Sequence, residues 1–544
     1  MIRTAAAFAA ALALATPAQA ARFAVGVRPG VPLPRVAARL PGSVSYGLAP
    51  LHVLVVDARS VRGVRRIAGV RYVEWLGTRR RTLAFTPTDP LAPRQWYVQA
   101  DHAFDLWPEP PALPPVRVAV IDSGIDASHP ELDGRVLAAR SFVGGSATVD
   151  QAGHGTFVAG EIAAALDNGQ GIAGMAFPAQ LLIAKVVRAD RSISVEGEAA
   201  AIRWAVDRGA RVVNLSLGGL RDPRDLQLDT YSPTEAAAID YAAKRGAVLV
   251  AAVGNADQAP SAPWPYASYP AALPHVIGVS AIARDGSVPS FSDRDTIYND
   301  IAAPGQDILS TFPRALTRAF PTCVDQGYSD CGPDEYRHAE GTSFAAPQVT
   351  AAAALLFAVA PRLTASQVTS IVERSADDAN ASNGCKRCAL LRDPLTGWGR
   401  LNVAKALGSL GGELPAPDRY ETNDDLRGAP PLPASRGTLK ATLDYWDDQR
   451  DVYRLPLHGG DVVRLRVDGM ARNPVALALW KPGARSVIGT RNRSYRVAQS
   501  RGSGALQRIE YRVPKGRGGR YSVEVRVAGG GSGSYTLTWS GAAR

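Results

Sequence analysis

Ser343 stands in a segment whose residue types suit nucleophilic catalysis. It follows Gly341 and Thr342 and leads into a small, apolar run, residues 344–356, that indicates a buried helix. A serine at a helix N-terminus lies beside unpaired backbone N–H groups and the positive end of the helix dipole, which both stabilise developing negative charge. We expect Thr342 to cap this helix and Pro347 to fall in its first turn. Alone, such a serine is more often a cap than a nucleophile.

A carboxylate follows an apolar run earlier in the chain. Residues 116–121 predict a buried strand, and Asp122 comes directly after it, at the start of the turn Ser123-Gly124. Open α/β sheets place their chemistry at the carboxyl ends of their strands. Asp122 is therefore expected on the sheet edge where functional groups collect.

His154 has a glycine on each side and begins a run of small residues that predicts a helix through Leu166. The positive end of the helix dipole disfavours the protonated imidazole, which keeps the ring neutral and able to accept a proton. A packed or capping histidine is the alternative, and it is the commoner case for a histidine taken by itself.

Asn255 follows another predicted strand, residues 248–253, after Gly254. An amide in this position can donate a hydrogen bond to a developing oxyanion. Gly-Asn is also common turn chemistry, so this residue by itself leaves both interpretations open.

Strands and helices alternate between these motifs. Strands are predicted at residues 181–187, 211–215, 248–253 and 276–280, and helices at residues 195–208 and 233–245. Alternation of this kind is typical of a parallel sheet covered by helices on both faces. We therefore predict a doubly wound, mostly parallel α/β domain over residues 84–410.

Asp122, His154, Asn255 and Ser343 occur in this order, each in its own motif. Together they resemble the subtilisin-like serine peptidases, the subtilase family, whose order of Asp, His and Ser distinguishes them from chymotrypsin-like and α/β-hydrolase enzymes. The likeness covers roughly residues 89–410. It implies that Ser343 is the nucleophile, His154 the general base and then acid, and Asp122 the carboxylate that orients the imidazole. It also implies that Asn255 and the Ser343 backbone N–H stabilise the tetrahedral intermediate.

The segment 214–219 resembles the family's substrate-binding edge, where an extended peptide adds as a strand. The resemblance therefore implies that the backbone of Ser216, Leu217 and Gly218 holds the substrate. Ser268 matches the base of the main specificity pocket. No cofactor is expected for catalysis.

Three residues differ from the best-known members of the family: Phe157, Phe344 and Gln348, the last of which stands where a histidine is frequent. None is a catalytic group, so we expect them to affect the shape of the pocket. Members often hold structural calcium, and Glu131 with the loop 167–171 offers oxygen ligands in the corresponding place. A solvated helix end is the alternative interpretation of that loop.

The first 20 residues are typical of a secretory signal peptide, with Arg3, an apolar run over residues 5–15 and an Ala-x-Ala site that ends at Ala20. A buried N-terminal helix is the alternative. No later stretch is expected to reach the length of a membrane span. We expect a soluble, monomeric protein that is secreted, extracellular or periplasmic in transit.

Residues 21–83 form a separate region. Strands are predicted at residues 51–57 and 70–76 and a helix at residues 60–67, which makes a small α/β unit. By the resemblance this unit is the inhibitory propeptide, which the enzyme removes itself. The run Arg79–Arg81 lies in its processing region.

The net charge of +11 comes from the same part of the chain, since residues 1–83 hold 13 Arg and no Lys against Asp57 and Glu74. The remaining residues balance in charge. That balance argues against a nucleic-acid or membrane-surface partner. The expected partners are protein or peptide substrates and the propeptide, as an intramolecular inhibitor.

Four cysteines fall late in the chain, at Cys323, Cys331, Cys385 and Cys388. An even number in an exported protein implies disulfides, and we favour the two local pairs, 323 with 331 and 385 with 388. A zinc or redox half-site at Cys385-x-x-Cys388 is the alternative, and no second such motif supports it.

Residues 411–417 are a linker by composition, and residues 418–544 form the last domain. Four segments there alternate with period two, at 451–455, 461–467, 521–527 and 535–539, and they predict an antiparallel β-sandwich. Asp418–Asp424, with Asp451-Val452-Tyr453, resembles the bacterial pre-peptidase C-terminal domain. Surface binding and a role in export followed by trimming are both open for it.

The main hypothesis is a secreted serine endopeptidase that works through an acyl-enzyme and matures by self-cleavage. A catalytically inactive scaffold whose sandwich binds polymers is the second hypothesis, and it is disfavoured because all four functional positions are filled. A non-peptidase acyl hydrolase is the third, and it is disfavoured because the segment 214–219 suits an extended peptide.

Overall fold

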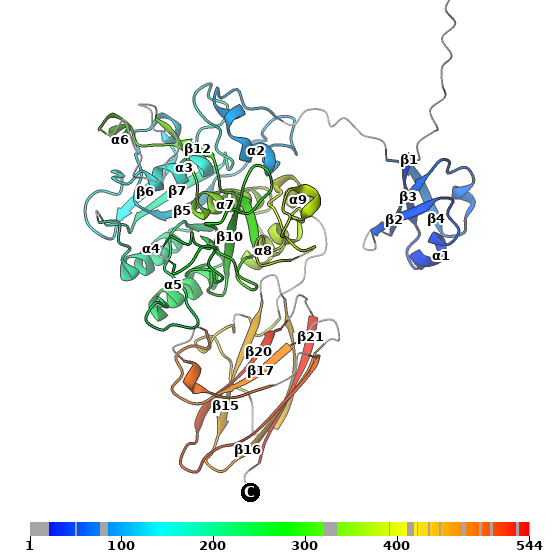
Figure 1. Ribbon diagram of the computed structural model, residues 1–544, viewed down its shortest axis with the longest axis vertical. Helices are drawn as coiled ribbons and strands as arrows, with labels where there is room; N and C mark the ends of the chain where they lie inside the picture. The colour runs from blue at the N-terminus through cyan, green and yellow to red at the C-terminus, as the bar shows by residue number, and fades with distance from the viewer. Residues whose placement is uncertain are drawn as a thin grey trace, which may run out of the picture. The chain divides into compact units, whose positions relative to one another are not determined.

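The structure is a computed structural model that divides by its internal contacts into two compact units, Met1–Leu83 and Ala84–Arg544, each described by itself (Figure 1). It describes residues 21–48, 52–76, 85–188, 190–257, 259–319, 335–390, 392–410, 418–421, 423–432, 436–444, 448–469, 475–488, 492–500, 504–528 and 533–542. The predicted signal peptide, the run Arg79–Arg81, residues 411–417 and the pair Cys323 and Cys331 lie outside these residues.

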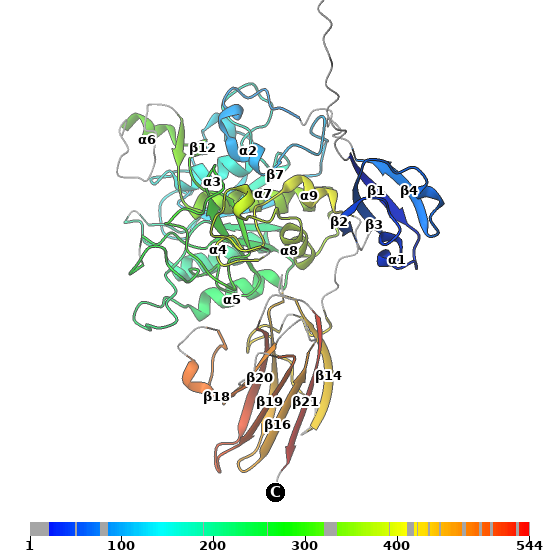
Figure 2. The same cartoon turned by 45° about the vertical axis from the view of Figure 1, so that its right-hand side comes forward.

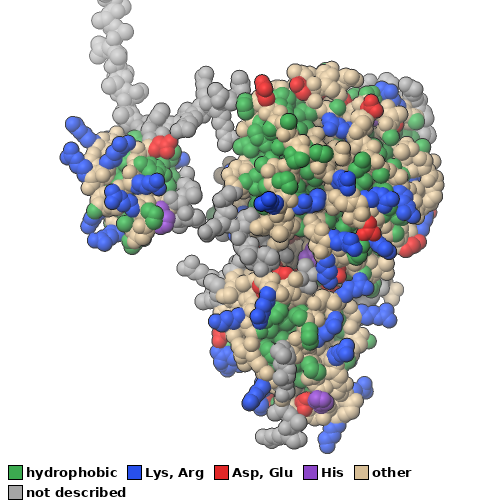
Figure 3. Space-filling model, turned by 180° about the vertical axis from the view of Figure 1, so that it is seen from behind, with side chains coloured by type: hydrophobic (Ala, Val, Ile, Leu, Met, Phe, Trp, Pro, Cys, Tyr) green, Lys and Arg blue, Asp and Glu red, His purple; other side chains and the backbone are tan. Residues whose placement is uncertain are grey.

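The N-terminal unit is a four-stranded antiparallel sheet with one short helix. Its elements are β1 (Ala21–Val27), α1 (Leu33–Ala37), β2 (Ser43–Leu48), β3 (Val53–Ala58) and β4 (Val70–Trp75), with the strands in the order β2-β3-β1-β4. Val25, Val36 and Val56 form its core, whereas the arginines of the described part are exposed (Figure 3). The unit therefore has its own apolar core under a basic surface.

The helix predicted at residues 60–67 is wrong. Only a single 3-10 turn, Val64–Arg66, forms there. Gly63 precedes it with a φ of 84°, no side chain caps it, and Ile67 returns to extended backbone. A run of three residues makes too few hydrogen bonds to continue as an α-helix.

The second unit is built on a seven-stranded sheet in the order β11-β10-β9-β8-β5-β7-β6, and every neighbouring pair is parallel. Its strands are β5 (Val116–Asp122), β6 (Val136–Ser141), β7 (Ala179–Lys185), β8 (Val212–Leu215), β9 (Val248–Ala252), β10 (Val276–Ile282) and β11 (Ile301–Pro304). β5 lies in the middle, where Val120 pairs with Ile183 on one side and Asn214 on the other. The predicted parallel α/β architecture is confirmed.

Helices cover both faces of this sheet (Figure 2). One face carries α3 (His154–Ala163), α7 (Thr342–Val359), α8 (Ala365–Arg374) and α9 (Val403–Gly408), and the other carries α4 (Val195–Asp207) and α5 (Pro233–Ala243). Successive side chains of a strand point to opposite faces. In β5, Val118 and Val120 accordingly join the core under α3 and α7, while Ala119 and Ile121 join the core under α4 and α5.

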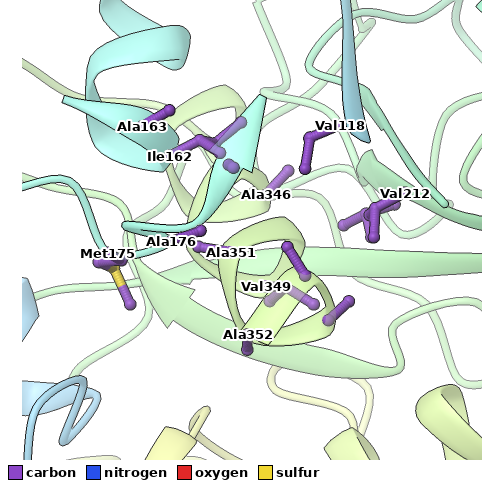
Figure 4. Packing of buried hydrophobic residues seen from close by; sticks show 14 of the residues in the cluster. Val118, Ile162, Ala163, Met175, Ala176, Val212, Ala346, Val349, Ala351 and Ala352 are labelled. Atoms are coloured by element: carbon purple, nitrogen blue, oxygen red, sulfur yellow. The ribbon is translucent and has the colours of Figure 1, made fainter. Parts of the chain in front are cut away.

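Helix α7 runs through the interior, and its alanines allow this. Ala346, Ala351 and Ala352 leave room for Ile162 of α3 and Val118 of β5 to pack close to the helix (Figure 4). The expectation that no later stretch reaches the length of a membrane span is wrong for α7, which is long and apolar enough, but 89% of its apolar window is buried inside the protein. Its hydrophobicity is that of a core helix.

Smaller elements complete the α/β part of the unit. They are α2 (Trp96–Ala100), β12 (Ile308–Thr311), α6 (Arg314–Ala319) and β13 (Tyr336–Ala339). β12 pairs antiparallel with β13, and β13 leads directly into the turn before α7. The pairing fixes the direction from which the chain enters that helix.

The C-terminal part is a sandwich of two four-stranded antiparallel sheets, in the orders β14-β21-β16-β19 and β15-β20-β17-β18. The strands are β14 (Arg436–Leu443), β15 (Arg450–Leu457), β16 (Val462–Asp468), β17 (Val475–Trp480), β18 (Arg496–Gln499), β19 (Leu506–Arg512), β20 (Gly519–Val527) and β21 (Gly533–Ala542). In β16, Val463 and Leu465 are buried and Arg464 is exposed, as the period-two pattern predicts.

The sandwich shares a buried cluster with the α/β part. Val452, Trp480 and Ile488 of the sandwich belong to the same apolar core as Ile239 of α5 and Leu273. Burial of such side chains is worth roughly 1.5–3 kcal/mol each relative to exposure. The two parts of this unit are therefore held together by more than a covalent link.

Candidate active site

His154 and Asp122 form a pair between the first residue of α3 and the last residue of β5. The imidazole Nδ1 lies 2.8 Å from Asp122 Oδ1 and 2.9 Å from Oδ2, and the carboxylate is 2% exposed. Burial lowers the pKa of His154, but the charge and hydrogen bond of Asp122 outweigh it, so the net shift raises the pKa above its ordinary value. The contact to Nδ1 leaves Nε2 as the nitrogen that can exchange a proton with a substrate or nucleophile.

Asp150 organises the approach to this pair, and the sequence reasoning missed it. Its carboxylate accepts hydrogen bonds from the Ser123 hydroxyl (2.8 Å), the backbone N–H of Gly153 (2.9 Å) and both donors of Thr156. Ser123 in turn accepts from the Gly155 N–H at 2.9 Å. Asp150 thus joins the turn after Asp122 to the start of α3, and a carboxylate shortly before a helix N-terminus was its only sequence signal.

Gly155 is required by the close approach of the start of α3 to the turn after β5. A Cβ on this residue would lie 2.1 Å from the Gly124 carbonyl oxygen and 3.2 Å from the Asp122 Cβ. Only glycine lets α3 begin so near the end of β5. The flanking glycine of the His154 motif therefore sets the distance between the imidazole and the carboxylate.

Ser343 is the second residue of α7 and is half-buried. Gly341 is the N-cap, with a φ of 149°, and no side chain caps the helix. The predicted cap is therefore wrong: the backbone N–H and hydroxyl of Thr342 both donate to Asn255 Oδ1, at 2.8 and 2.9 Å. Thr342 ties the serine turn to the end of β9 instead of closing its own helix.

Pro347 is also not in the first turn, since it is the sixth residue of α7. A proline there has no N–H to donate to the carbonyl four residues earlier, which is that of Ser343. The Ser216 hydroxyl supplies the missing donor at 2.6 Å, and the Ser343 hydroxyl donates to the Ser216 carbonyl at 3.2 Å. The proline therefore leaves the Ser343 carbonyl without its usual helical donor, and Ser216, just after β8, donates to it instead.

Asn255 follows the end of β9 beside this turn. Its Oδ1 accepts both donors of Thr342, so its Nδ2 is the atom left to donate. That nitrogen lies 3.2 Å from where a Cβ on Gly341 would be. An amide donor is thus held next to the backbone of the serine turn, the arrangement that stabilises an oxyanion formed at Ser343.

Phe344 brings the serine turn to the histidine. Its ring centroid lies 5.3 Å from that of His154 and 4.5 Å from that of Phe157. Phe157 and Gln348 do not shape a pocket as expected, because both are fully buried, and the Gln348 amide donates to Glu161 and to the carbonyls of Pro304 and Phe344. The structure thus brings Asp122, His154, Asn255 and Ser343 to one end of the sheet.

The expected substrate edge leaves β8 at the same end. Ser216 is buried, Leu217 is half-buried and Gly218 is exposed. Among the described residues, no hydrogen bond occupies the backbone of Leu217 or Gly218, whereas Gly219 exchanges two hydrogen bonds of 2.9 Å with Tyr269. An extended peptide can therefore pair with this segment next to Ser343.

The loop expected to hold calcium does not fit the ion. Glu131 accepts hydrogen bonds from the Ile172 N–H (3.2 Å), the Tyr336 hydroxyl (3.0 Å) and the Asn168 amide (3.3 Å). Burial raises its pKa to about 7. Calcium needs the lone pairs that these donors occupy, so the alternative of a closed, hydrogen-bonded loop is favoured at this place.

A second acidic cluster, which the sequence reasoning missed, lies in the C-terminal part. Ligand atoms of Glu421, Asp424 and Asp448 all lie within 4.8 Å of one another. Glu421 Oε1, Asp448 Oδ1 and the Oδ1 of fully buried Asp451 have no hydrogen-bond partner among the described residues. Glu421, Asp424 and Asp451 belong to the two short motifs that resemble the pre-peptidase C-terminal domain, which was the available signal, and Asp448 lies three residues before the second motif.

Cys385 and Cys388 form a disulfide in the structure. Cys388 and the loop around it pack with Ile282 and Ala302 at the edge of the sheet. A zinc half-site would need the two sulfurs as free ligands. The disulfide therefore favours the structural interpretation of this motif over the metal-binding one.

Comparison with known proteins gives the same assignment as the geometry. The model of the "Subtilase family" matches residues 115–389. Thermitase from Thermoactinomyces vulgaris is 32% identical over 59% of this chain and 99% of its own length. A thermophilic serine proteinase from Bacillus sp. (strain AK1) is 36% identical over 44% of this chain and 51% of its own.

A solved structure supports the fold. The crystal structure of fervidolysin from Fervidobacterium pennivorans, described as a keratinolytic enzyme related to subtilisin, matches 90% of this chain and 68% of its own, with a TM-score of 0.50 and 24% identity. At this identity the likeness concerns the fold alone. With the family match and the identity to thermitase, the chain belongs to the subtilase family and is a subtilisin-like serine protease.

Proposed function

We propose that this protein is a secreted serine endopeptidase that hydrolyses peptide bonds of extracellular proteins and is made as a self-processing precursor. The proposal rests above all on the contact of His154 Nδ1 with both oxygens of Asp122, at 2.8 and 2.9 Å, close to α7, whose first turn contains Ser343. The pair needs no further group to act as a general base toward a hydroxyl.

In the proposed reaction a peptide pairs with the backbone of Leu217 and Gly218, which sets its carbonyl near Ser343. The Ser343 hydroxyl leaves the Ser216 carbonyl, transfers its proton to His154 Nε2 and adds to the substrate carbonyl carbon. Asp122 stabilises the imidazolium that forms. The new oxyanion accepts hydrogen bonds from Asn255 Nδ2 and the Ser343 N–H.

Collapse of this intermediate breaks the C–N bond, and His154 gives its proton to the leaving amine. Water then attacks the acyl-enzyme as His154 takes a proton from it, and the second collapse returns the proton to Ser343. Each proton removed by the imidazole is thus returned, and the net reaction is addition of one water to one peptide bond. No cofactor takes part.

For the organisation of the chain we propose residues 1–20 as a signal peptide, 21–83 as an inhibitory propeptide, 84–410 as the catalytic domain, and 418–544 as a C-terminal domain after a linker. The division of the chain into compact units at Leu83 and Ala84 supports a propeptide that folds separately. Its own apolar core around Val56 is what a unit that is later released requires.

The test is covalent labelling of the secreted protein with a fluorophosphonate probe. We expect wild type to be labelled and to mature, whereas Ser343→Ala is unlabelled and accumulates as a precursor that retains residues 21–83. Ser382→Ala, at an exposed turn serine, is the matched control and should behave as wild type. Normal maturation of Ser343→Ala without another protease contradicts self-processing, and absence of labelling in wild type favours the inactive scaffold.

We also propose that Glu421, Asp424 and Asp448 hold a structural calcium ion. Burial raises the pKa of Glu421 to about 7, and burial together with the charge of Asp451 raises the pKa of Asp448. The acids therefore lack sufficient positive charge among the described residues. Carboxylate oxygens without donors fit a hard cation. The ion would neutralise the cluster and take no part in the reaction.

A further inference from the structure

Two segments leave the sheet next to the turn that holds Ser343. One is Ser216–Gly219, after β8, and the other is Val253–Asn255, after β9. The chain at Ser268 and Tyr269 spans them: the Ser268 N–H donates to the Val253 carbonyl at 2.7 Å, and Tyr269 exchanges two hydrogen bonds of 2.9 Å with Gly219. Ser268 therefore lies between the expected substrate edge and the segment that ends in Asn255.

The carboxyl group of Asp293 lies directly behind Ser268. The Ser268 hydroxyl donates to Asp293 Oδ2 at 3.4 Å, the Ala256 N–H donates to Asp293 Oδ1 at 3.1 Å, and the Asp293 N–H donates to the Gly254 carbonyl at 3.0 Å. These bonds fix the carboxyl against the segment that ends in Asn255. The side chain is 2% exposed.

Gly254 allows the acid to approach the segment that ends in Asn255. The residue is half-buried, and a Cβ on it would lie 2.3 Å from Asp293 Oδ2 and 2.5 Å from the Ser268 hydroxyl. Its φ is 108°, a conformation that favours glycine. Both oxygens thus lie directly against the backbone of Gly254, one residue before Asn255.

The carboxyl has no cation to balance it. None of the described arginines or lysines forms a salt bridge with Asp293. Burial raises its pKa to about 8, helped by the charge of Asp257 and opposed by the Ser268 hydroxyl. A buried acid without a cationic partner, beside residues expected to bind substrate, is typical of a functional position.

We propose that Asp293 and Ser268 form an acidic floor to the slot that receives the substrate side chain preceding the cleaved bond, and that the enzyme prefers lysine or arginine there. A long, cationic side chain would reach the floor between the two segments and supply the missing counter-charge. The inference rests on the proposed endopeptidase function and names the substrate class of the same site.

The test uses internally quenched peptides that differ only in the residue before the cleaved bond: Lys, Arg, Met as an uncharged side chain of comparable length, and Glu. For wild type we expect kcat/KM for Lys and Arg to exceed that for Met by about tenfold or more, and Glu to be cleaved worst. Asp293→Asn keeps the shape and removes the charge, so the Lys-to-Met ratio should fall by about tenfold. Asp257→Asn, the same substitution at a nearby exposed carboxylate, should leave the ratio within about twofold.

The possible results separate the two proposals. A wild-type enzyme that cleaves Met as well as Lys overturns the acidic floor while leaving the peptidase function intact, and this comparison does not depend on the folding of any variant. An unchanged ratio in Asp293→Asn also overturns it, with Asp293→Ser as a second variant if the first does not fold. Failure to cleave any of the four peptides, with no fluorophosphonate label, contradicts the endopeptidase function and this inference together.

Discussion

Two of the histidine–aspartate pairs among the described residues have the same contact distance and a buried carboxylate, but they differ in their surroundings. In one, His154 Nδ1 lies 2.8 Å from Asp122, and in the other, His275 Nε2 lies 2.8 Å from Asp424. Burial lowers and the partner carboxylate raises the pKa of each imidazole, and the net shift is upward in both. The pair by itself therefore does not define a catalytic site.

The difference lies in what surrounds each pair. Beside His154 are the N-terminus of α7 and the Asn255 amide, which suit developing negative charge, and a serine. Beside His275 and Asp424 are further acids, Glu421 and Asp448, and no such nucleophile among the described residues of that cluster. The first setting favours proton transfer, whereas the second attracts a cation.

The sharpest test of this comparison is to remove each histidine. His154→Ala should lower kcat by about 10⁶-fold, the loss that the corresponding substitution causes in subtilisin, because no other group can take the serine proton. His275→Ala should leave kcat/KM within about threefold, since that imidazole is outside the active site. Both are measured with one peptide substrate, and a large loss of kcat in His275→Ala would contradict the assignment of the two pairs.

Removing the oxyanion donor should have the next largest effect. Asn255→Ala is expected to lower kcat by about 10²–10³-fold, the figure established for this donor in subtilisin. KM should change little, because the amide acts on charge that exists only in the transition state. Asn383→Ala, at an exposed turn, is the control. A change confined to KM would place Asn255 in substrate binding instead.

The acidic cluster should respond to metal and not to substrate. Asp424→Asn is expected to abolish calcium binding, measured by metal analysis after dialysis, and to lower the melting temperature in calcium by about 5–10 °C. Glu131→Gln should leave the calcium content unchanged, because its oxygens already accept hydrogen bonds from the protein. Loss of one ion per chain in Glu131→Gln would reverse the assignment of the two acidic sites.

A rise in pH should have opposite effects at the two pairs: it should increase the activity that depends on His154 and, without calcium, decrease the stability contributed by the second pair. Activity requires neutral His154, so kcat/KM is expected to fall as the pH drops through its raised pKa. Without calcium, His275 and Glu421 both bind protons more tightly in the folded state, so their contribution to stability is present at low pH and is lost as the pH rises, for Glu421 through about 7. Melting curves across this range in a chelator, with and without excess calcium, measure the second effect.

Calcium should reverse that trend. The ion binds the ionised carboxylates, so with calcium the stability of wild type should rise with pH over the same range. Asp424→Asn should show the chelator behaviour in both buffers. Identical melting curves for wild type with and without calcium would argue that the cluster is balanced by the protein alone.

Much of the fold could be predicted because its signals are local. The run 116–121 is largely apolar, as a central parallel strand requires. The helices predicted at 195–208 and 233–245 follow Ser194 and Ser232, whose side chains accept hydrogen bonds from the N–H groups of Gly197 and Glu235. The wrong helix at 60–67 fell where Gly63 and the following chain offered no cap. The presence or absence of a capping residue therefore accounts both for the helices that form and for the predicted helix that does not.

By itself, the sequence determined the identity and order of Asp122, His154, Asn255 and Ser343, because each stands at the end of a strand or the start of a helix and carries its own motif. Tertiary packing alone decided the contacts between them: that Thr342 binds Asn255, that Ser216 takes the carbonyl left open by Pro347, and that Asp293 lies behind Ser268. These contacts join segments far apart in the chain. Their geometry follows from how the strands and helices pack, which no local pattern encodes.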